Sequence, residues 1–350
     1  MLYSLDEICL IPATTTSIKH RSDVKVNYDN ALLPIFTAPM ACIVDGGNYL
    51  QFVNKGINTI IPRSVHWDTR IELARSGNWI AVGLSEAKYI YESTELVNKF
   101  TYKNPLKICI DQANGHMREL IDLCRDIKNL FGQQVIIMTG NIANPYTYDD
   151  YALAGVDYVR VGIGGGSRCT TSVQTGIHYP MGSLIHECNK RRKIINTNIK
   201  DFGLSCIYKS IPKIIADGGI NHIDHIVKAL ALGADYVMLG KMLAKTNEAC
   251  GMCQTKEDGD YREYFGMSTE KAQRLVNNAA CKPFENFNPK HTEGTNSLVK
   301  ITGPLNELVY DITHALRSSM SYCNAYNLES FVGKVKFDTM TSSGFSAYIK

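Results

Sequence analysis

Eight short apolar segments, spaced along the first 240 residues, constrain the fold of this chain more than any other feature. A strand buried on both faces is a near-continuous apolar run rather than an alternating one, because neither side meets water. These runs are rich in Ile, Val and Leu and end at glycine, proline or polar residues. The expected strands are Leu32–Thr37, Asn58–Ile61, Trp79–Gly83, Lys107–Asp111, Gln134–Met138, Tyr158–Ile163, Lys213–Ala216 and Tyr236–Leu239.

Segments with helical periodicity separate these runs. Apolar side chains recur every three or four residues in them, which indicates amphipathic helices. The clearest are Asp68–Ala74, Ser93–Phe100, Met117–Leu130, Tyr146–Ala154 and His222–Ala231. Strands alternating with helices predict a parallel α/β sheet. A doubly wound sheet is the alternative, but eight strands favour a closed (β/α)₈ TIM barrel.

Polar residues follow the ends of several of these strands. In a barrel those ends meet at one mouth, where catalytic loops gather. A fold does not name a reaction, so this clustering predicts only a barrel enzyme. The residues are Asp111, Asn114, Asn141, Cys169, Asp217 and Lys241.

The sixth strand opens into Gly164-Gly165-Gly166-Ser167, and Cys169 follows two residues later. Glycines let backbone N–H groups approach an anion closely. A thiol beside such a loop is expected of a nucleophile held near a bound phosphate. A glycine turn with an incidental buried cysteine is the other interpretation, since a lone glycine loop is weak evidence.

About a hundred residues follow the last strand. Tyr261–Ser268 is strand-like, Thr269–Asn277 looks helical, and Leu305–Tyr322 predicts a final helix that covers the barrel. The polar stretch Cys281–Ser297 has little periodicity, and long loops of this kind are often functional. We expect one catalytic domain over 1–350, with a mobile flap at about 270–297.

Composition excludes several classes of function. The net charge of +3 is too small to indicate a nucleic-acid or membrane-surface partner. No apolar run approaches the roughly 18 residues of a spanning helix. The eleven cysteines are scattered, and only Cys250 and Cys253 are closely spaced, so we expect neither disulfides nor zinc. A cytoplasmic protein is the simplest expectation.

Several of these motifs resemble the inosine monophosphate (IMP) dehydrogenase and guanosine monophosphate (GMP) reductase family. The cysteine loop does so through Thr171, followed by Gln174-Thr-Gly176. The resemblance runs in order from about residue 30 to the last helix. Further matching motifs are Ala216-Asp-Gly-Gly-Ile220, Gly233–Gly240, Tyr264-Phe-Gly-Met-Ser268 and Gly303-Pro304.

Within the family the chain is most similar to GMP reductases. No regulatory insert separates the second and third strands, and the stretch between Met267 and Glu293 is too short for the dehydrogenase flap. The Arg-Tyr pair with which that flap activates water is absent from the sequence. Ile110-Asp-Gln-Ala-Asn-Gly115 also resembles the reductase form of this loop.

The resemblance implies reductive deamination, in which GMP and NADPH give IMP, NADP and ammonia. Purine C2 is electron-poor, so a thiolate can add to it and an amine can leave. Cys169 would be the nucleophile. Thr171 and Glu293 would deliver the proton that the departing amine needs.

Other roles carry over from the family position by position. Asp111, Asn114, Gly115 and Arg63 would face the cofactor. Carbonyls of Gly164, Gly166 and Cys169 match a K⁺ site, and the family is usually homotetrameric. Ser167, Gly219, Gly240 and Tyr264 would hold the phosphate of the substrate, and Asp217 would hold the ribose hydroxyls. Met267, Ser268 and Gly294 would border the base, and the other substrate-binding residues would be Met40, Lys241 and Lys290.

Several family residues are replaced, including those at Ala41, Gly165, Ser172, Lys241 and Lys290. These changes leave open which purine nucleotide, and which of NADPH and NADH, is preferred. Three alternatives follow: an NAD-dependent IMP dehydrogenase, an enzyme acting on a related nucleotide, and a non-catalytic nucleotide-binding relative. The retained cysteine, threonine and glutamate argue against the last.

Overall fold

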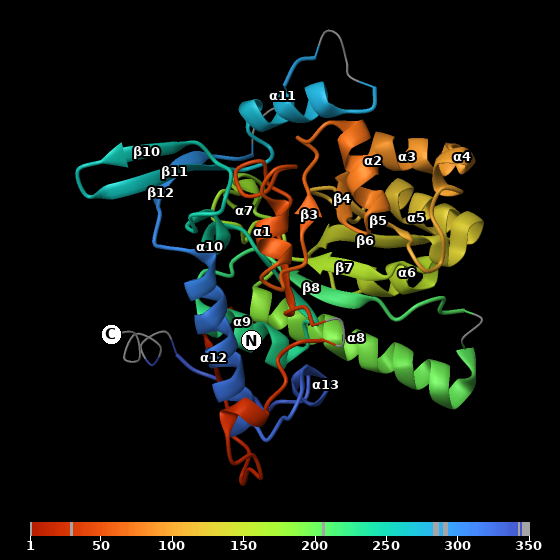
Figure 1. The fold of residues 1–350 in the computed structure, drawn as a ribbon. Helices are drawn as coiled ribbons and strands as arrows, with labels where there is room; N and C mark the ends of the chain where they lie inside the picture. The colour runs from red at the N-terminus through yellow and green to blue at the C-terminus, as the bar shows by residue number, and fades with distance from the viewer. Residues whose placement is uncertain are drawn as a thin grey trace.

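The computed structural model describes residues 2–28, 31–204, 207–282, 287–289, 293–341 and 344. Eight parallel strands form one sheet in the order β2-β9-β8-β7-β6-β5-β4-β3. The sheet curls into a barrel with helices around it (Figure 1). Its strands are β2 (Ile35–Thr37), β3 (Ile60–Ile61), β4 (Trp79–Val82), β5 (Leu106–Asp111), β6 (Val135–Ile142), β7 (Tyr158–Val161), β8 (Lys213–Asp217) and β9 (Tyr236–Leu239).

The two outermost strands of this order, β2 and β3, meet through the segment that precedes β3. Phe36 and Asn58 form a parallel bridge. The Thr37 amide donates to the Asn58 carbonyl at 2.9 Å, and the Ile60 amide donates to Thr37 Oγ1 at 3.0 Å. These contacts bring the sheet almost to closure, so the predicted (β/α)₈ barrel is confirmed.

The helices lie outside the sheet because each has one apolar face. In α5 (Arg118–Phe131), for example, the side chains of Leu120, Cys124, Ile127 and Phe131 recur every three or four residues and are buried. The other helices are α1 (Tyr49–Val53), α2 (Trp67–Arg75), α3 (Leu84–Glu92), α4 (Thr94–Val97), α6 (Thr147–Ala154), α7 (Thr171–Thr175), α8 (Met181–Phe202), α9 (Ile223–Leu232), α10 (Lys241–Ala244), α11 (Glu270–Ala279), α12 (Leu305–Tyr322) and α13 (Leu328–Phe331), with 3₁₀ turns η1 (Arg21–Asp23) and η2 (Gly132–Gln134).

Some segments differ in extent from the prediction, and some helices were not predicted. The expected helix over Ser93–Phe100 is only the single turn α4, and α3 before it went unpredicted. Within α3 the Glu86 side chain accepts a hydrogen bond from the Gly83 amide, which starts the helix directly after β4. The helix α8 also went unpredicted, and β6 runs four residues further than expected, to Ile142.

Several elements lie outside the barrel. The strands β1 (Ile8–Leu10) and β13 (Phe337–Thr339) pair antiparallel, and α12 packs against α9. A small antiparallel sheet, drawn at the upper left of Figure 1, contains β10 (Cys253–Lys256), β11 (Gly259–Phe265) and β12 (Asn296–Lys300).

The predicted flap at about 270–297 includes α11 and the start of β12. Residues 283–286 and 290–292 lie outside the described part, so its expected mobility stays a prediction. In the part of the chain that the structure describes, no helix is long and apolar enough to cross a membrane.

Candidate active site

The cysteine loop connects β7 to α7 at the carboxyl-terminal end of the barrel. Gly164 has a φ of +76°, and a Cβ there would lie 2.5 Å from Ser172 Cβ, so only glycine fits this turn. The turn carries the chain back across the barrel end. Cys169 is thereby held half-buried, two residues before Thr171 begins α7.

Cys169, Thr171 and Glu293 form one hydrogen-bonded chain. Cys169 Sγ donates to Thr171 Oγ1 at 3.2 Å. Thr171 Oγ1 in turn donates to Glu293 Oε2 at 2.5 Å. The structure therefore brings together the three side chains for which the sequence predicted the chemistry.

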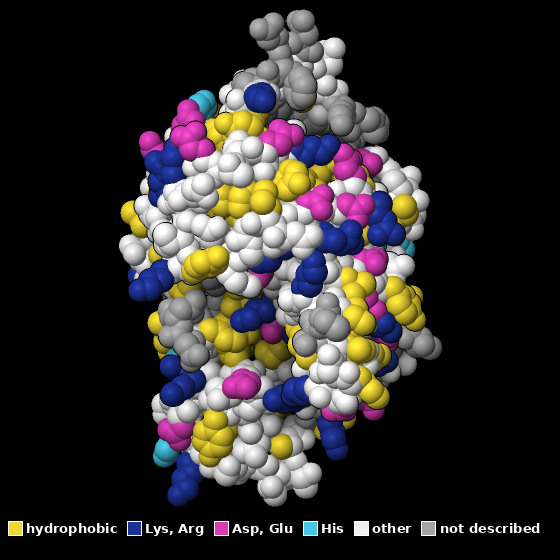
Figure 2. Space-filling model, turned by 90° about the vertical axis from the view of Figure 1, so that its right-hand side faces the viewer, with side chains coloured by type: hydrophobic (Ala, Val, Ile, Leu, Met, Phe, Trp, Pro, Cys, Tyr) yellow, Lys and Arg dark blue, Asp and Glu magenta, His cyan; other side chains and the backbone are white. Residues whose placement is uncertain are grey.

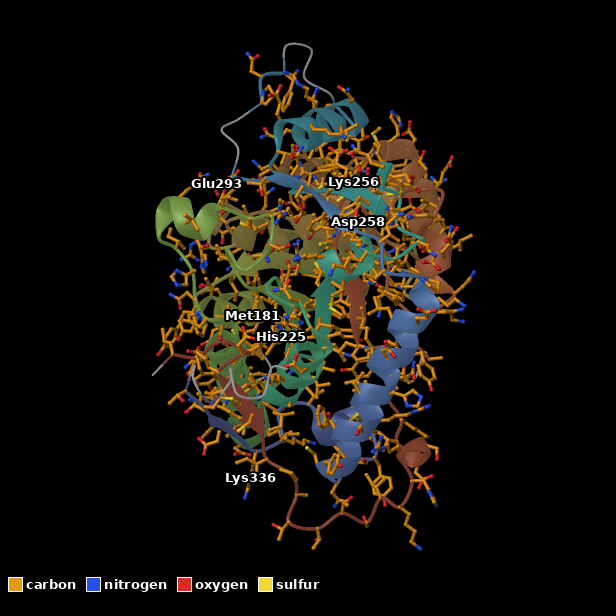
Figure 3. All side chains as sticks on the ribbon, turned by 90° about the vertical axis from the view of Figure 1, so that its left-hand side faces the viewer. Met181, His225, Lys256, Asp258, Glu293 and Lys336 are labelled. Carbon is orange, nitrogen blue, oxygen red and sulfur yellow. The ribbon has the colours of Figure 1, made fainter. Side chains whose placement is uncertain are left out.

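Backbone pairing holds Glu293 at this place. Cys169 and Gly294 form an antiparallel bridge, and the Thr170 amide donates to the Glu293 carbonyl at 2.9 Å. The Thr295 amide donates to the Arg168 carbonyl at 3.1 Å. Figure 3 shows Glu293 beside the yellow-green α7. The late loop and the cysteine loop thus share a short ladder, which fixes the carboxylate relative to the thiol.

The residues predicted to hold a phosphate lie around Tyr264, whose side chain is almost fully buried on β11. A Cβ on Gly240 would lie 2.8 Å from Tyr264 Oη, so glycine lets the phenol approach the end of β9. Ser167 Oγ is buried, and its side chain interacts with Tyr264, which partly offsets the rise that burial causes in the pKa of the phenol.

Gly219 belongs to the turn after β8, at a φ of +74°. Its carbonyl is 3.0 Å from His225 Nδ1, and His225 Nε2 is 2.7 Å from Asp6 Oδ1. Figure 3 labels His225 next to Met181, another side chain near this turn. The α9 histidine therefore ties the Gly219 turn to the amino-terminal segment, a link that the sequence did not suggest.

The residues predicted to border the base lie near the sulfur or near Gly240. A Cβ on Gly294 would lie 2.6 Å from Ser268 Oγ, so Ser268 adjoins the residue that forms the bridge with Cys169. Met40 Sδ would lie 3.6 Å from a Cβ on Gly240. Met40 and Met267 are partly buried against the core, Lys241 begins α10, and Lys290 lies outside the described residues.

Arg160 connects two of the predicted site carboxylates, and sequence reasoning missed it. Its side chain projects from β7 and is 7% exposed. Nη1 donates to Asp111 Oδ1 at 2.6 Å, and Nη2 donates to Asp217 Oδ2 at 2.7 Å. Asn141 Nδ2 also donates to Asp217 Oδ2 at 2.7 Å. The ends of β5, β6, β7 and β8 thus share one polar network.

This network keeps its charges because they are paired. Burial alone would raise the pKa of Asp111, but the adjacent Arg160 guanidinium lowers it overall. Burial works against the charge of Arg160, yet Asp217 and the other neighbouring acids raise its pKa well above its usual value. We conclude that Asp111 stays ionised, and that one arginine sets the positions of both Asp111 and Asp217 as hydrogen-bond acceptors.

The predicted cofactor side surrounds the end of β5. Arg63 Nη1 donates to the Asp111 carbonyl at 3.4 Å, and its buried Nε makes no hydrogen bond within the described residues. Asn114 is exposed, and its side chain accepts from the His116 amide. The Gly115 amide and carbonyl bond to Asn141 and Tyr151. Arg63 and Asp111 are thus the groups best placed for a ligand here, while Gly115 serves packing.

Two of the three carbonyls predicted to bind K⁺ already accept hydrogen bonds. The Gly166 carbonyl accepts from the Cys169 amide at 2.9 Å, and the Gly164 carbonyl accepts from Ser172 Oγ at 3.3 Å. A carbonyl has a second lone pair, so both can still coordinate a cation. Three carbonyls alone do not complete a K⁺ shell, which makes the fit partial.

A family model described as the IMP dehydrogenase / GMP reductase domain matches residues 81–347. An IMP dehydrogenase from Chlorobaculum parvum is 34% identical over 241 residues, which are 68% of this chain and 46% of that protein. A GMP reductase from Vibrio atlanticus is 27% identical over 340 residues, 92% of this chain and 90% of that protein. Human GMP reductase 2 is 29% identical over 259 residues, 74% of this chain and 67% of that protein. The chain thus spans about half the length of the IMP dehydrogenases that it matches.

Proposed function

The chain belongs to the IMP dehydrogenase and GMP reductase family, and from this premise we propose that it is a GMP reductase-like oxidoreductase. The reaction would convert GMP, NADPH and two protons into IMP, NADP⁺ and ammonium. The hydrogen-bonded chain from Cys169 through Thr171 to Glu293 carries the proposal. The match covers 90% of the Vibrio GMP reductase but only about half the length of the dehydrogenases. This difference supports the reductase reaction over the dehydrogenase reaction.

The first step is addition of sulfur to the purine. Glu293 takes the thiol proton through Thr171, along the two hydrogen bonds described above. The resulting thiolate forms an S–C2 bond on the electron-poor carbon that bears the amino group. The proton then resides on Glu293, within one hydroxyl of the reacting carbon.

The second step is loss of the amine. Thr171 and Glu293 return the proton to the amino nitrogen, a second proton comes from solvent, and the C2–N bond breaks with release of ammonium. When bound, the reduced nicotinamide supplies the hydride that C2 accepts. The S–C2 bond then breaks, which restores the Cys169 thiolate and leaves IMP.

Binding would place C2 against the sulfur. Ser167, Gly219, Gly240 and Tyr264 would hold the phosphate, with Ser167 and Tyr264 supplying buried hydroxyls. Asp217 would accept hydrogen bonds from the ribose hydroxyls, since its contact with Arg160 orients the carboxylate. Asp111 and Arg63 would border the nicotinamide.

The test is an assay in both directions with purified protein. GMP with NADPH should give equal amounts of oxidised cofactor, ammonia and IMP. IMP with NAD should give little XMP and NADH. Nucleotide binding without turnover in either direction would contradict an enzymatic function altogether.

IMP oxidation is the second candidate, because the Chlorobaculum IMP dehydrogenase is 34% identical to this chain. That reaction needs a group that activates water for attack on the cysteine-bound purine. The family's Arg-Tyr pair for this task does not occur in the sequence. NADH formation from IMP, with no ammonia from GMP, would establish this candidate instead.

A further inference from the structure

A second cavity lies at the amino-terminal end of the barrel, away from the candidate active site. Its volume is about 430 Å³, within the range of small-molecule sites. The residues that line it stand at the starts of β4 to β9 and in the segments that lead into them. Figure 2 faces this end and shows a hollow near its middle, where apolar side chains surround Lys or Arg atoms with an acidic atom beside them.

Aromatic rings form the inner wall of this cavity, which we call the base cavity. Trp79, Tyr158 and Tyr236 line it, and Phe36 packs behind them. The ring centroids of Trp79 and Tyr158 are 5.2 Å apart, and those of Tyr158 and Tyr236 are 5.9 Å apart. Contacting rings from four strands fill the interior of the barrel at this level. They are edge-on or tilted to one another, and their exposed edges and faces form the inner wall of the cavity.

Two lysines enter the same cavity from different strands. Lys107 is the second residue of β5. Its Nζ donates one hydrogen bond, to the Gly77 carbonyl at 3.0 Å. Lys213 begins β8, and its Nζ lies 5.0 Å from the ring centre of Tyr28 and 5.5 Å from that of Tyr236. Neither ammonium forms an ion pair with a carboxylate of the described chain. An ammonium has three donors, so most donors of this pair are free to bind a ligand.

The acidic residue on the wall does not cancel these charges. Asp157 already accepts from Lys128 Nζ at 3.0 Å and from the Ile137 amide at 2.8 Å. Its charge is therefore balanced by Lys128, which is not among the residues that line the cavity. The base cavity keeps an excess of two positive charges beside aromatic rings. Burial also lowers the pKa of Lys107, as expected of an ammonium without a counterion.

We propose that the base cavity binds a small aromatic anion, with its ring against Trp79, Tyr158 and Tyr236 and its anionic groups on Lys107 and Lys213. A cation would be repelled by the two ammonium groups. An uncharged apolar molecule would leave both of them desolvated and unpaired. A dianion satisfies both lysines and the rings together.

This site is separate from the proposed nucleotide site. Lys107 and Asp111 are four residues apart on β5, so the two ends of that strand are about 13 Å apart. The aromatic layer occupies the barrel interior at the start of these strands. The proposal is therefore independent of the proposed GMP reductase activity, and either can fail without the other.

Tryptophan fluorescence offers a direct test, because the chain has only two tryptophans and Trp67 does not line the cavity. In a Trp67→Phe background, terephthalate is titrated while the emission of Trp79 is followed. Terephthalamide, which has the same shape without charge, is the matched probe. We expect saturable binding of terephthalate, at least about tenfold tighter than that of terephthalamide.

Lys107→Met and Lys213→Met should each weaken terephthalate binding by about tenfold, because each removes one charge-assisted contact. Lys88→Met is the control, since Lys88 is exposed and pairs with Glu119 away from the cavity. Equal affinity for the two probes, or lysine variants that bind like Lys88→Met, would overturn the proposal.

A measurement on the unmodified chain avoids dependence on how the variants fold. Acetic anhydride labels accessible lysines, and mass spectrometry reports the extent of labelling at each one. Terephthalate should slow the acetylation of Lys107 and Lys213 by fivefold or more, while Lys88 stays unchanged. Equal labelling of Lys107 and Lys213 with and without terephthalate would also overturn the proposal.

Discussion

The two ends of the barrel differ in whether their buried charged groups have partners within the protein. At the carboxyl-terminal mouth, Arg160 is buried between Asp111 and Asp217, and every charge of this group has a partner inside the protein. At the amino-terminal base, Lys107 and Lys213 line a cavity without a carboxylate partner in the described chain. The Arg160 network at the mouth is therefore paired before a ligand arrives, whereas the two lysines at the base would gain their counterions only from outside.

The two ends also differ in how they are built. The mouth depends on loops, and its thiol and carboxylate meet through backbone pairing between segments more than a hundred residues apart. The base depends on ring packing between neighbouring strands. We therefore expect substitutions at the mouth to change activity, and substitutions at the base to change stability and the binding of anions.

Of these variants, Cys169→Ala should have the largest effect. This effect should be on activity and not on stability. Removing the proposed nucleophile should lower kcat with GMP and NADPH by about 10⁴-fold, with little change in the melting temperature. Cys9→Ala, which removes an exposed thiol at the far pair of strands β1 and β13, is the control. A Cys169→Ala variant with near-normal turnover would remove the covalent mechanism.

Arg160→Met tests whether the charge network at the mouth is also structural. It leaves Asp111 and Asp217 buried without their partner, so the free energy of unfolding should fall by about 4 kcal/mol in urea titrations. Arg274→Met, which breaks an exposed pair with Glu270, should change it by less than about 1 kcal/mol. Similar losses in both variants would mean that the network contributes no more than a surface pair.

The same network sets a pH dependence. The pKa of Asp111 is lowered in the folded protein, so its contribution to stability is present above the unfolded pKa of about 4. That contribution should disappear as the pH falls through the lower folded value. The free energy of unfolding, plotted against pH, should therefore have a different slope at low pH in the parent and in Arg160→Met.

Trp79→Ala tests the aromatic layer at the base. It removes a large buried side chain that contacts Phe36 and Tyr158, so the free energy of unfolding should fall by about 3 kcal/mol. The turnover per folded molecule should remain close to that of the parent. A loss of turnover equal to that of a mouth variant would show that the two ends are not independent.

Thr171→Val tests the proton path between thiol and carboxylate. It keeps the side-chain shape but removes the hydroxyl that joins Cys169 to Glu293, so kcat should fall by about 10²-fold. Thr171→Ser keeps the hydroxyl and should recover most of the rate. Equal rates in the two variants would contradict the relay.

His116 should produce the smallest effect, on the cofactor side of the mouth. Burial lowers its pKa, and Nε2 accepts from the Ala143 amide, so the folded state holds it neutral. This contribution is present above about pH 6.5 and is lost as the pH falls through the lower folded pKa. Melting temperatures of His116→Gln should therefore fall less steeply than those of the parent as the pH decreases through this range.

The barrel was predictable because its strands are buried on both faces and therefore appear as continuous apolar runs. The four-residue strand at Tyr236–Leu239 was predicted to the residue. The helix α3 was missed because it follows β4 without a polar break, and its start depends on a hydrogen bond from Gly83 to Glu86. Such a cap is a local contact that periodicity does not register.

The site was predictable only in part from physical reasoning. The glycine loop and Cys169 stand out in the sequence, but composition alone would make Glu293 a solvated carboxylate. The family resemblance supplied its role, and the structure places it against Thr171. Arg160 did have a signal, since a charged residue inside an apolar strand requires a buried partner. The base cavity had no signal in the sequence, because its residues become neighbours only when the barrel closes.

One isotope experiment tests the proposed chemistry at purine C2 most directly. GMP carrying ¹⁵N in its amino group is incubated with NADPH deuterated at the transferred position, and the products are analysed by mass spectrometry. We predict one ¹⁵N-ammonium and one deuterium at C2 of IMP per turnover, and neither with Cys169→Ala. Retention of ¹⁵N in the nucleotide, or deuterium-free IMP, would contradict the account.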